Sequence, residues 1–409
     1  MSHHHRTHVR IATSLFAGLG AQVGLWSVLV PELVSSRGLS PGALGVALGV
    51  LAGTSILSLI AGGAVADRIG RRPLACAGAA GIGVALLALA AVEAPAALLA
   101  TLAAYGLANG LLDLGANTVG ADVERVHRRP VMIRLHAGFS AAAALAALLT
   151  AAALSAGVGH RALYAAGGIG LLALAAVAAR APLPGAAAAG GESPRLGPGH
   201  GAVAADGDGP RVGPGHRAAA GGDSPLGRAG LLRAPGVLMA LALVTLCFLG
   251  DGVLEGYSAL YLRDLLGAGA LLTGVGLAAF HTASLAGRLA SARALHRLGE
   301  RGLITLAGAA AAAGMLLVVL ARSPALAAAG LLVVGAGLAP VIPTALSVAG
   351  RSDPRRAAAA VSLVTSVGYG AFVVGPPLVG ALADATSLRT ALVPVVATTA
   401  LLALVARRL

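Results

Sequence analysis

Apolar segments long enough to cross a lipid bilayer recur along almost the whole chain of 409 residues. A helix needs about 20 such residues to span the hydrocarbon core, and each segment is bounded by Arg, Pro or Gly. The predicted spans are 11–34, 42–65, 73–92, 96–120, 132–156, 162–181, 234–258, 270–291, 302–321, 325–348, 357–380 and 386–406. The sequence therefore predicts an all-α, polytopic membrane protein with twelve transmembrane helices.

The composition leaves too little polar surface for a water-soluble globule. Only 11% of the residues are charged and 57% are hydrophobic, whereas about a quarter of a soluble domain is charged. A soluble enzyme is excluded on this ground. The sequence also offers no nucleophile–base pair, metal-ligand cluster or phosphate-binding loop, so we expect neither an enzyme nor a bound cofactor or metal.

Arginine supplies all 29 basic residues, and its distribution predicts the topology. When the connections between spans are assigned alternately to two sides, 24 arginines fall on the side of both termini and five on the other. Basic loops are retained in the cytoplasm, so both termini are predicted to be cytoplasmic. The net charge of +13 then indicates anionic lipid on the cytoplasmic side as a partner, not nucleic acid.

A stretch rich in Gly, Pro and Ala separates two groups of six spans. Within it, the sequence Pro-Arg-Leu-Gly-Pro-Gly-His at 194–200 returns as Pro-Arg-Val-Gly-Pro-Gly-His at 210–216, which is typical of a flexible linker. The predicted organisation is a cytoplasmic tail (1–10), a six-helix bundle (11–181), a cytoplasmic linker (182–233), a second six-helix bundle (234–406) and a tail (407–409).

Related residues lie 229 positions apart in the two groups. Residues 68–70 (Arg-Ile-Gly) match 297–299 (Arg-Leu-Gly), and 45–46 (Gly-Val) match 274–275 (Gly-Val). Six spans, an even number, separate the copies. The two bundles are therefore expected to share one orientation and to be related by an axis along the membrane normal.

Residues 63–72 read Gly-Ala-Val-Ala-Asp-Arg-Ile-Gly-Arg-Arg. This segment resembles the cytoplasmic signature of the major facilitator superfamily, and residues 287–301 hold a degenerate copy in the second half. The resemblance implies the two-bundle major facilitator fold and a multi-pass permease of the bacterial plasma (inner) membrane.

The same resemblance implies a cytoplasmic gate at the signature. Its residues are Asp67, Arg68, Gly70 and Arg72. Acidic and basic groups there would pair with each other and with a facing helix terminus, holding the inner gate closed. Gly70 is expected to permit a tight turn, and Arg71 to contact lipid.

Three further stretches resemble a bacterial branch related to fucose-type sugar:proton symporters. They are residues 110–117, 129–140 and 250–264. The resemblance implies secondary active transport of a small polar solute, with sugars and related metabolites as one class, driven by protons.

Ionisable groups inside the spans are the candidates for proton coupling, because they are costly in a bilayer. Asp113 is the predicted main proton carrier and Asp251 or Glu255 an auxiliary site. His136 lies at a depth similar to Asp113 and could pair with it, while Glu32 is assigned to the outer half of the path. Burial favours the neutral carboxyl, so such a group can load a proton on one side and release it on the other. Packing, interhelical hydrogen bonding and interfacial exposure are the structural alternatives.

Polar and aromatic side chains in the spans are the candidates for substrate contact. Several recur every four residues on the fourth span, which places them on one face of a helix. The candidates are Gln22, Trp26, Tyr105, Asn109, Asn117, His281 and Tyr369. An indole can stack on a sugar ring or simply pack, and amides can line a cavity or join helices.

Two other functions stay open at the level of sequence. Proton-antiport efflux of drugs or metabolites is one. Many exporters carry Gly-Pro in the fifth helix, but residues 132–156 contain no proline, which favours uptake. The other is a membrane sensor without flux, for which the chain lacks a sizeable soluble domain. We expect a monomer that binds protons and a small-molecule substrate.

Overall fold

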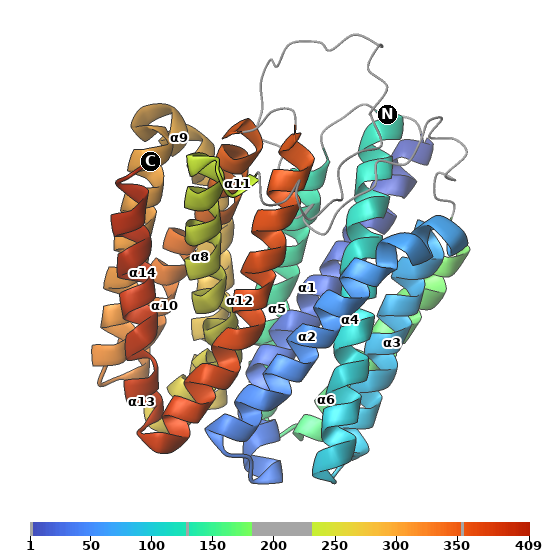
Figure 1. The fold of residues 1–409 in the computed structure, drawn as a ribbon. Coiled ribbons are helices and arrows are strands. Elements are labelled where there is room, and N and C mark those ends of the chain that lie inside the picture. Colours follow the sequence, from blue (N-terminus) through green and yellow to red (C-terminus); the bar gives the residue numbers. More distant parts are fainter. Residues whose placement is uncertain (1–2, 128–130, 182–230, 353–355) are drawn as a thin grey trace.

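The computed structural model describes residues 3–127, 131–181, 231–352 and 356–409. The regular elements in these ranges are helices: α1 (His3–Arg37), α2 (Pro41–Ile69), α3 (Arg71–Ala91), α4 (Pro95–His127), α5 (Met132–Ser155), α6 (His160–Arg180), α8 (Pro235–Leu260), the π-helical turn η2 (Tyr261–Leu265), α9 (Ala270–Leu320), α10 (Pro324–Leu338), α11 (Val341–Ser352), α12 (Ala357–Ala385), α13 (Leu388–Ala391) and α14 (Val393–Ala406). The predicted all-α fold is confirmed for this part of the chain. The start of α1 and the end of α14 lie at the same end of the bundle (Figure 1).

Eleven helical segments of the described chain are long and apolar enough to cross a membrane. One of them, α9, has 51 residues, or about 75 Å of helix, more than twice the hydrocarbon thickness. Its backbone leaves the helical region at Gly299 (φ 67°, ψ 176°). The arms on either side of Gly299 correspond to the predicted spans 270–291 and 302–321, the second of which ends one residue beyond the helix. The predicted number of twelve therefore depends on counting these arms separately.

Serine and proline set two of the helix starts. Ser40 and Ser323 have extended backbones, and the side chain of each accepts a hydrogen bond from a backbone N–H in the first turn of α2 or α10. The next residue is proline in both cases, which suits the first helical position because no N–H partner is needed there.

The helices form two groups that lie side by side. α1 to α6 pack on one another, as do α8 to α14, and the main contacts between the groups are α2 with α12 and α5 with α9. In Figure 1 the blue and green helices occupy one side and the yellow to red helices the other. We call these groups the N-half and the C-half.

Glycines with positive φ support the internal repeat. Gly38 (φ 61°) and Gly267 (φ 68°) lie 229 positions apart, and so do Gly70 (φ 91°) and Gly299 (φ 67°). Glycine adopts such backbone angles without a steric penalty. The expectation that Gly70 permits a tight turn between two helices is thus confirmed.

A second repeat-related pair of glycines lets the halves approach each other closely. A Cβ atom added to Gly45 of α2 would lie 2.6 Å from the Pro376 carbonyl oxygen of α12, and one added to Gly274 of α9 would lie 2.3 Å from Ala151 Cβ of α5. Small residues at such contacts allow helix backbones to pack directly. Both contacts between the halves therefore depend on glycine, which has no side chain.

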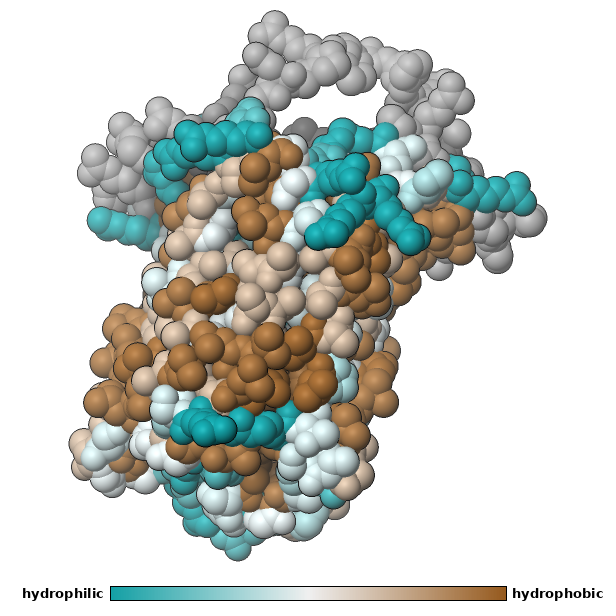
Figure 2. Space-filling model, turned by 90° about the vertical axis from the view of Figure 1, so that its left-hand side faces the viewer, coloured by the Kyte–Doolittle hydropathy of each residue, from teal (hydrophilic) through white to brown (hydrophobic). Residues whose placement is uncertain are grey.

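The outer surface is apolar where lipid would cover it. Figure 2 shows a hydrophobic band across the side formed by the C-half, with hydrophilic side chains above it. Leu306, Leu320 and Leu404 are each more than half exposed. A contiguous apolar surface of this kind is typical of a membrane-facing protein.

Candidate functional site

A polar cluster joins α1, α2 and α4 inside the N-half. Tyr105 Oη donates a hydrogen bond to Gln22 Oε1, and Gln22 Nε2 donates to Asn109 Oδ1 at 3.0 Å. Asn109 Nδ2 in turn donates to Ser55 Oγ at 3.1 Å. The Trp26 ring lies 5.6 Å from the Tyr105 ring, between centroids. The structure therefore brings four of the predicted substrate residues together and adds Ser55.

Asp113 and Asn117 lie further along the same face of α4. Asn117 Nδ2 donates to both the Asp113 backbone oxygen (2.9 Å) and Asp113 Oδ1 (2.8 Å). Asp113 is half-buried and interacts electrostatically with Tyr369 of α12, in the other half. Asp113 therefore lies near the C-half and is only partly exposed.

His136 of α5 does not pair with Asp113. The described structure holds no ion pair between them. The His136 ring instead contacts the Phe16 ring edge-on at 5.0 Å, and its Nε2 atom is buried without a hydrogen-bond partner. The suggested pairing is therefore not present in this conformation.

Arg288 is a charged group that the sequence analysis did not place at the site. Its charge lies near Asp251 and Glu255 of α8, His281 of its own helix and His136 of the other half. Arg288 is exposed, and within the described ranges it forms no ion pair with either carboxylate. The predicted span 270–291 contains Arg288, but the sequence analysis counted this arginine with the cytoplasmic ones. Arg288 lies seven residues after His281, and residues seven apart lie on the same face of an α-helix. This spacing was the signal that could have placed Arg288 at the site.

The other candidates in the C-half are His281 of α9, near this arginine, and Tyr369 of α12. His281 is 8% exposed and lies beside Phe280, with ring centroids 5.4 Å apart. Tyr369 packs on Phe248 at 5.1 Å. Both residues thus have an aromatic neighbour within the C-half, and Tyr369 also lies near Asp113 of the N-half.

Direct polar contacts between the halves occur at the end away from the termini, which we call the closed end. Asp384 of α12 accepts hydrogen bonds from Gly42 N (3.0 Å) and Ser40 Oγ (2.8 Å) at the start of α2. Tyr257 Oη donates to the Pro41 oxygen at 2.8 Å. A carboxylate at a helix N-terminus is favoured by the exposed N–H groups and the helix dipole.

Glu32 also belongs to the closed end. Its carboxylate lies 2.5 Å from Arg263 of η2 and 3.9 Å from His160 of α6. The Glu32–Arg263 ion pair joins the two halves. Sequence assigned Glu32 to the outer part of a proton path, whereas in this conformation its partner is an arginine of the opposite half.

The opposite end carries both termini and most of the arginines, and we call it the arginine-rich end. Arg71 pairs with Asp122 of α4, and Arg125 lies 3.3 Å from the same carboxylate. The expectation that Arg71 contacts lipid is wrong, because α4 extends seven residues beyond its predicted end and brings Asp122 beside α3. These ion pairs lie within the N-half.

The gate residues are placed only in part. Gly70 forms the turn between α2 and α3, Arg68 is exposed and Arg72 half-buried. The side chain of Asp67 lies outside the described residues. In the described ranges, no group of three or more His, Cys, Asp or Glu side chains is placed to hold a metal ion.

These observations define a class of protein. Two similar helical halves with lipid-facing outer surfaces meet along an interface that holds ionisable groups, and they touch through polar contacts at one end. Such an architecture is that of a multi-pass membrane transporter.

The family follows from comparison with known proteins. The sequence pattern of the Major Facilitator Superfamily matches residues 11–376, so the chain belongs to that superfamily. It is similar to membrane protein MosC of Rhizobium meliloti (27% identity, 92% of this chain and 84% of MosC). It is also similar to an uncharacterized MFS-type transporter of Yersinia pestis (26% identity, 92% and 88%).

Solved structures show the same fold. The nucleoside transporter NupG gives a TM-score of 0.75 at 12% identity, covering 100% of this chain and 99% of NupG. A bacterial homologue of the lysosomal transporter Spinster, in an inward-facing and unoccupied conformation, gives 0.73 at 15% identity, covering 100% and 98%. The chain is thus a membrane transporter of the permease type and not an enzyme, as predicted.

Proposed function

We propose that this transporter moves a small polar solute by alternating access and couples the movement to protons through Asp113. The observation that carries the proposal is the placement of Asp113, a half-buried carboxylate with an amide partner, Asn117, and a phenol from the opposite half, Tyr369. No ion pair holds it charged within the described structure. A carboxyl in such surroundings can change its protonation state when the halves move.

The solute would bind beside this carboxyl, at the cluster formed by Gln22, Trp26, Tyr105 and Asn109. The cluster offers amide donors and acceptors next to two aromatic rings. Polar solutes with an apolar face, such as sugars and nucleosides, suit this combination. Nucleosides are included because NupG has the same fold. Asn117, His281 and Tyr369 would complete the site from both halves.

Asp251 and Glu255 would form the auxiliary proton site, with Arg288 as their countercharge. Support for this role is that Arg288 lies near both carboxylates and near His136 of the other half. An arginine that stays charged would stabilise whichever carboxylate is ionised. Its influence on each group would change as the halves separate.

Two ends of the interface would open in turn. In this conformation the closed end is held by Asp384, Tyr257 and Glu32. The signature residues Asp67, Arg68, Gly70 and Arg72 are proposed to close the arginine-rich end in the opposite state. With the termini in the cytoplasm, the present conformation would be the inward-facing one.

Reconstitution into liposomes tests the function. Nucleosides and monosaccharides would be screened for uptake driven by an inward proton gradient. We expect Asp113→Asn to lose gradient-driven accumulation while keeping solute counterflow, because a neutral amide carries no proton. Glu93→Gln is the matched control, since Glu93 forms an exposed ion pair with Arg161 within the N-half. Undiminished gradient-driven uptake by Asp113→Asn would refute the coupling role.

The direction of transport is tested by the same preparation. Solute accumulation on the side to which protons flow indicates symport. Solute movement against the proton flow would instead indicate antiport, the efflux alternative. Binding without flux in any orientation would favour a sensor.

A further inference from the structure

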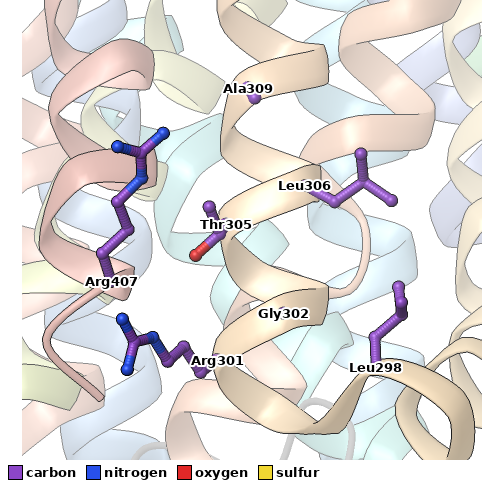
Figure 3. A pocket seen from close by; sticks show the side chains of 7 residues that line it. All are labelled: Leu298, Arg301, Gly302, Thr305, Leu306, Ala309 and Arg407. Carbon is purple, nitrogen blue, oxygen red and sulfur yellow. The ribbon is translucent and has the colours of Figure 1, made fainter.

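We propose that a groove between α9 and α14 at the arginine-rich end binds the phosphate headgroup of an anionic phospholipid. The cavity has a volume of ≈590 Å³, and its lining includes Arg301, Thr305 and Arg407. In Figure 3, Arg301 and Thr305 extend from α9 toward α14, from which Arg407 extends beside them. The site lies outside the interface between the halves, so it does not depend on the proposed transport function.

In the described ranges, neither arginine of this groove is paired with a carboxylate. The arginine–carboxylate ion pairs found in the described ranges engage Arg71, Arg125, Arg161, Arg263 and Arg351. Neither Arg301 nor Arg407 belongs to one of them. Both arginines are exposed, so solvent screens their mutual repulsion, and an anion held between them would interact favourably with both. A phosphate diester supplies that charge and accepts bidentate hydrogen bonds.

Thr305 contributes a hydrogen-bond donor without a partner to the lining of the groove. Hydroxyl groups on neighbouring helices donate to the carbonyl four residues earlier, as Thr344 and Thr399 do. The Thr305 hydroxyl makes no hydrogen bond in the described structure, although its oxygen is buried. A buried hydroxyl without a partner is costly. A phosphate oxygen would accept its hydrogen bond once the side chains that cover the hydroxyl, with their ends in the groove, move aside to hold the anion.

The surroundings of the groove indicate a lipid as the source of the phosphate. Leu298 and Leu306 also line it and are 47% and 59% exposed. The groove lies on the side of the C-half, where Figure 2 shows an apolar band below hydrophilic side chains. A phospholipid would place its headgroup at the arginines and its acyl chains along that band. Basic pockets between transmembrane helices bind anionic headgroups in this way.

Lipid retention tests this inference directly. The full chain would be purified in detergent, incubated with phosphatidylglycerol or phosphatidylcholine, and examined by native mass spectrometry for bound lipid. We expect preferential retention of phosphatidylglycerol by the wild type. Each of Arg301→Gln and Arg407→Gln should weaken it roughly fivefold, and the double variant more. Thr305→Val, which keeps the shape but removes the hydroxyl, should also weaken it.

Arg408→Gln is the matched control, because Arg408 is exposed, adjacent in sequence and not part of the lining. It should retain lipid as the wild type does. Equal loss in Arg408→Gln and Arg407→Gln would overturn the site in favour of diffuse surface charge. Glycerol phosphate at millimolar concentration is the free-anion probe; if it displaces the lipid completely and stabilises the protein equally, the groove is an anion site and the lipid assignment is wrong.

Discussion

The two ends of the interface between the halves differ in how they are held. At the closed end, a carboxylate, a phenol and an ion pair bridge the halves, and glycines allow the helices to touch. At the arginine-rich end, the described ion pairs of Arg71 and Arg351 each stay within one half. Among the described residues, the polar contacts that bridge the halves lie at the closed end, so weakening that end should favour the other state.

The largest expected effect comes from filling a close contact. Gly274→Leu introduces a side chain whose Cβ would lie 2.3 Å from Ala151 Cβ and 2.9 Å from the Ala147 oxygen. Overpacking of this kind costs about 1–3 kcal/mol. We expect a lower melting temperature in detergent and at least tenfold slower uptake in liposomes.

Gly269→Leu is the control for that substitution. Gly269 lies five residues earlier at the same end, and a Cβ atom there has no neighbour within 4 Å. Its variant should melt and transport nearly as the wild type does. If Gly274→Leu behaves like Gly269→Leu, the halves do not meet closely at this contact.

A smaller effect is expected from breaking the ion pair between the halves. Arg263→Gln removes the partner of Glu32, and both side chains are partly exposed (29% and 22%). Because solvent screens such pairs, we expect the conformational equilibrium to shift by about 1 kcal/mol or less toward the state in which the closed end has opened. The shift should become smaller as the salt concentration rises. Labelling of an introduced cysteine at Leu48, which is buried against Gly256, would report the shift as a roughly two- to fivefold faster reaction.

Arg161→Gln serves as its counterpart. Arg161 pairs with Glu93 inside the N-half, and both are well exposed (56% and 69%). Labelling at position 48 should not change in this variant. A similar acceleration in both variants would mean that loss of charge, and not loss of the bridge, opens the closed end.

The sequence predicts the helices well because their signal is local. The predicted span 132–156 corresponds to α5 (Met132–Ser155), and the paired glycines at 70 and 299 have the repeated backbone conformation. The length of an apolar segment and the position of a glycine can be recognised without knowing which distant segments pack together. The predicted ends are less accurate where a helix continues beyond the bilayer, as α4 does to His127.

Side-chain partners were harder to predict, because they depend on how distant segments meet. Asp384 caps a helix that begins more than 340 residues earlier, and no local pattern indicates that contact. Gln22 was predicted as a substrate contact. Its hydrogen bond to Asn109, and that of Asn109 to Ser55, could not be predicted because they depend on how three helices pack. Arg288 was missed because an arginine within four residues of the end of the predicted span 270–291 was counted with the cytoplasmic arginines.

The most direct test of alternating access is a pair of distances measured by electron spin resonance. In a background without native cysteines, one spin-label pair would join Ser35 and Ala385 across the closed end. The other would join Ile69 and Ala359 across the arginine-rich end. These positions are exposed in the structure. Asp384→Asn, which weakens the charged cap on α2, is the perturbation.

The account predicts reciprocal changes in the two distances. In Asp384→Asn, the population with a long distance across the closed end should rise several-fold, since hydrogen bonds to a charged group contribute about 1.5–3 kcal/mol. The distance across the arginine-rich end should shorten in that same population. An unchanged arginine-rich end, or two ends that lengthen together, would contradict alternating access by the two halves.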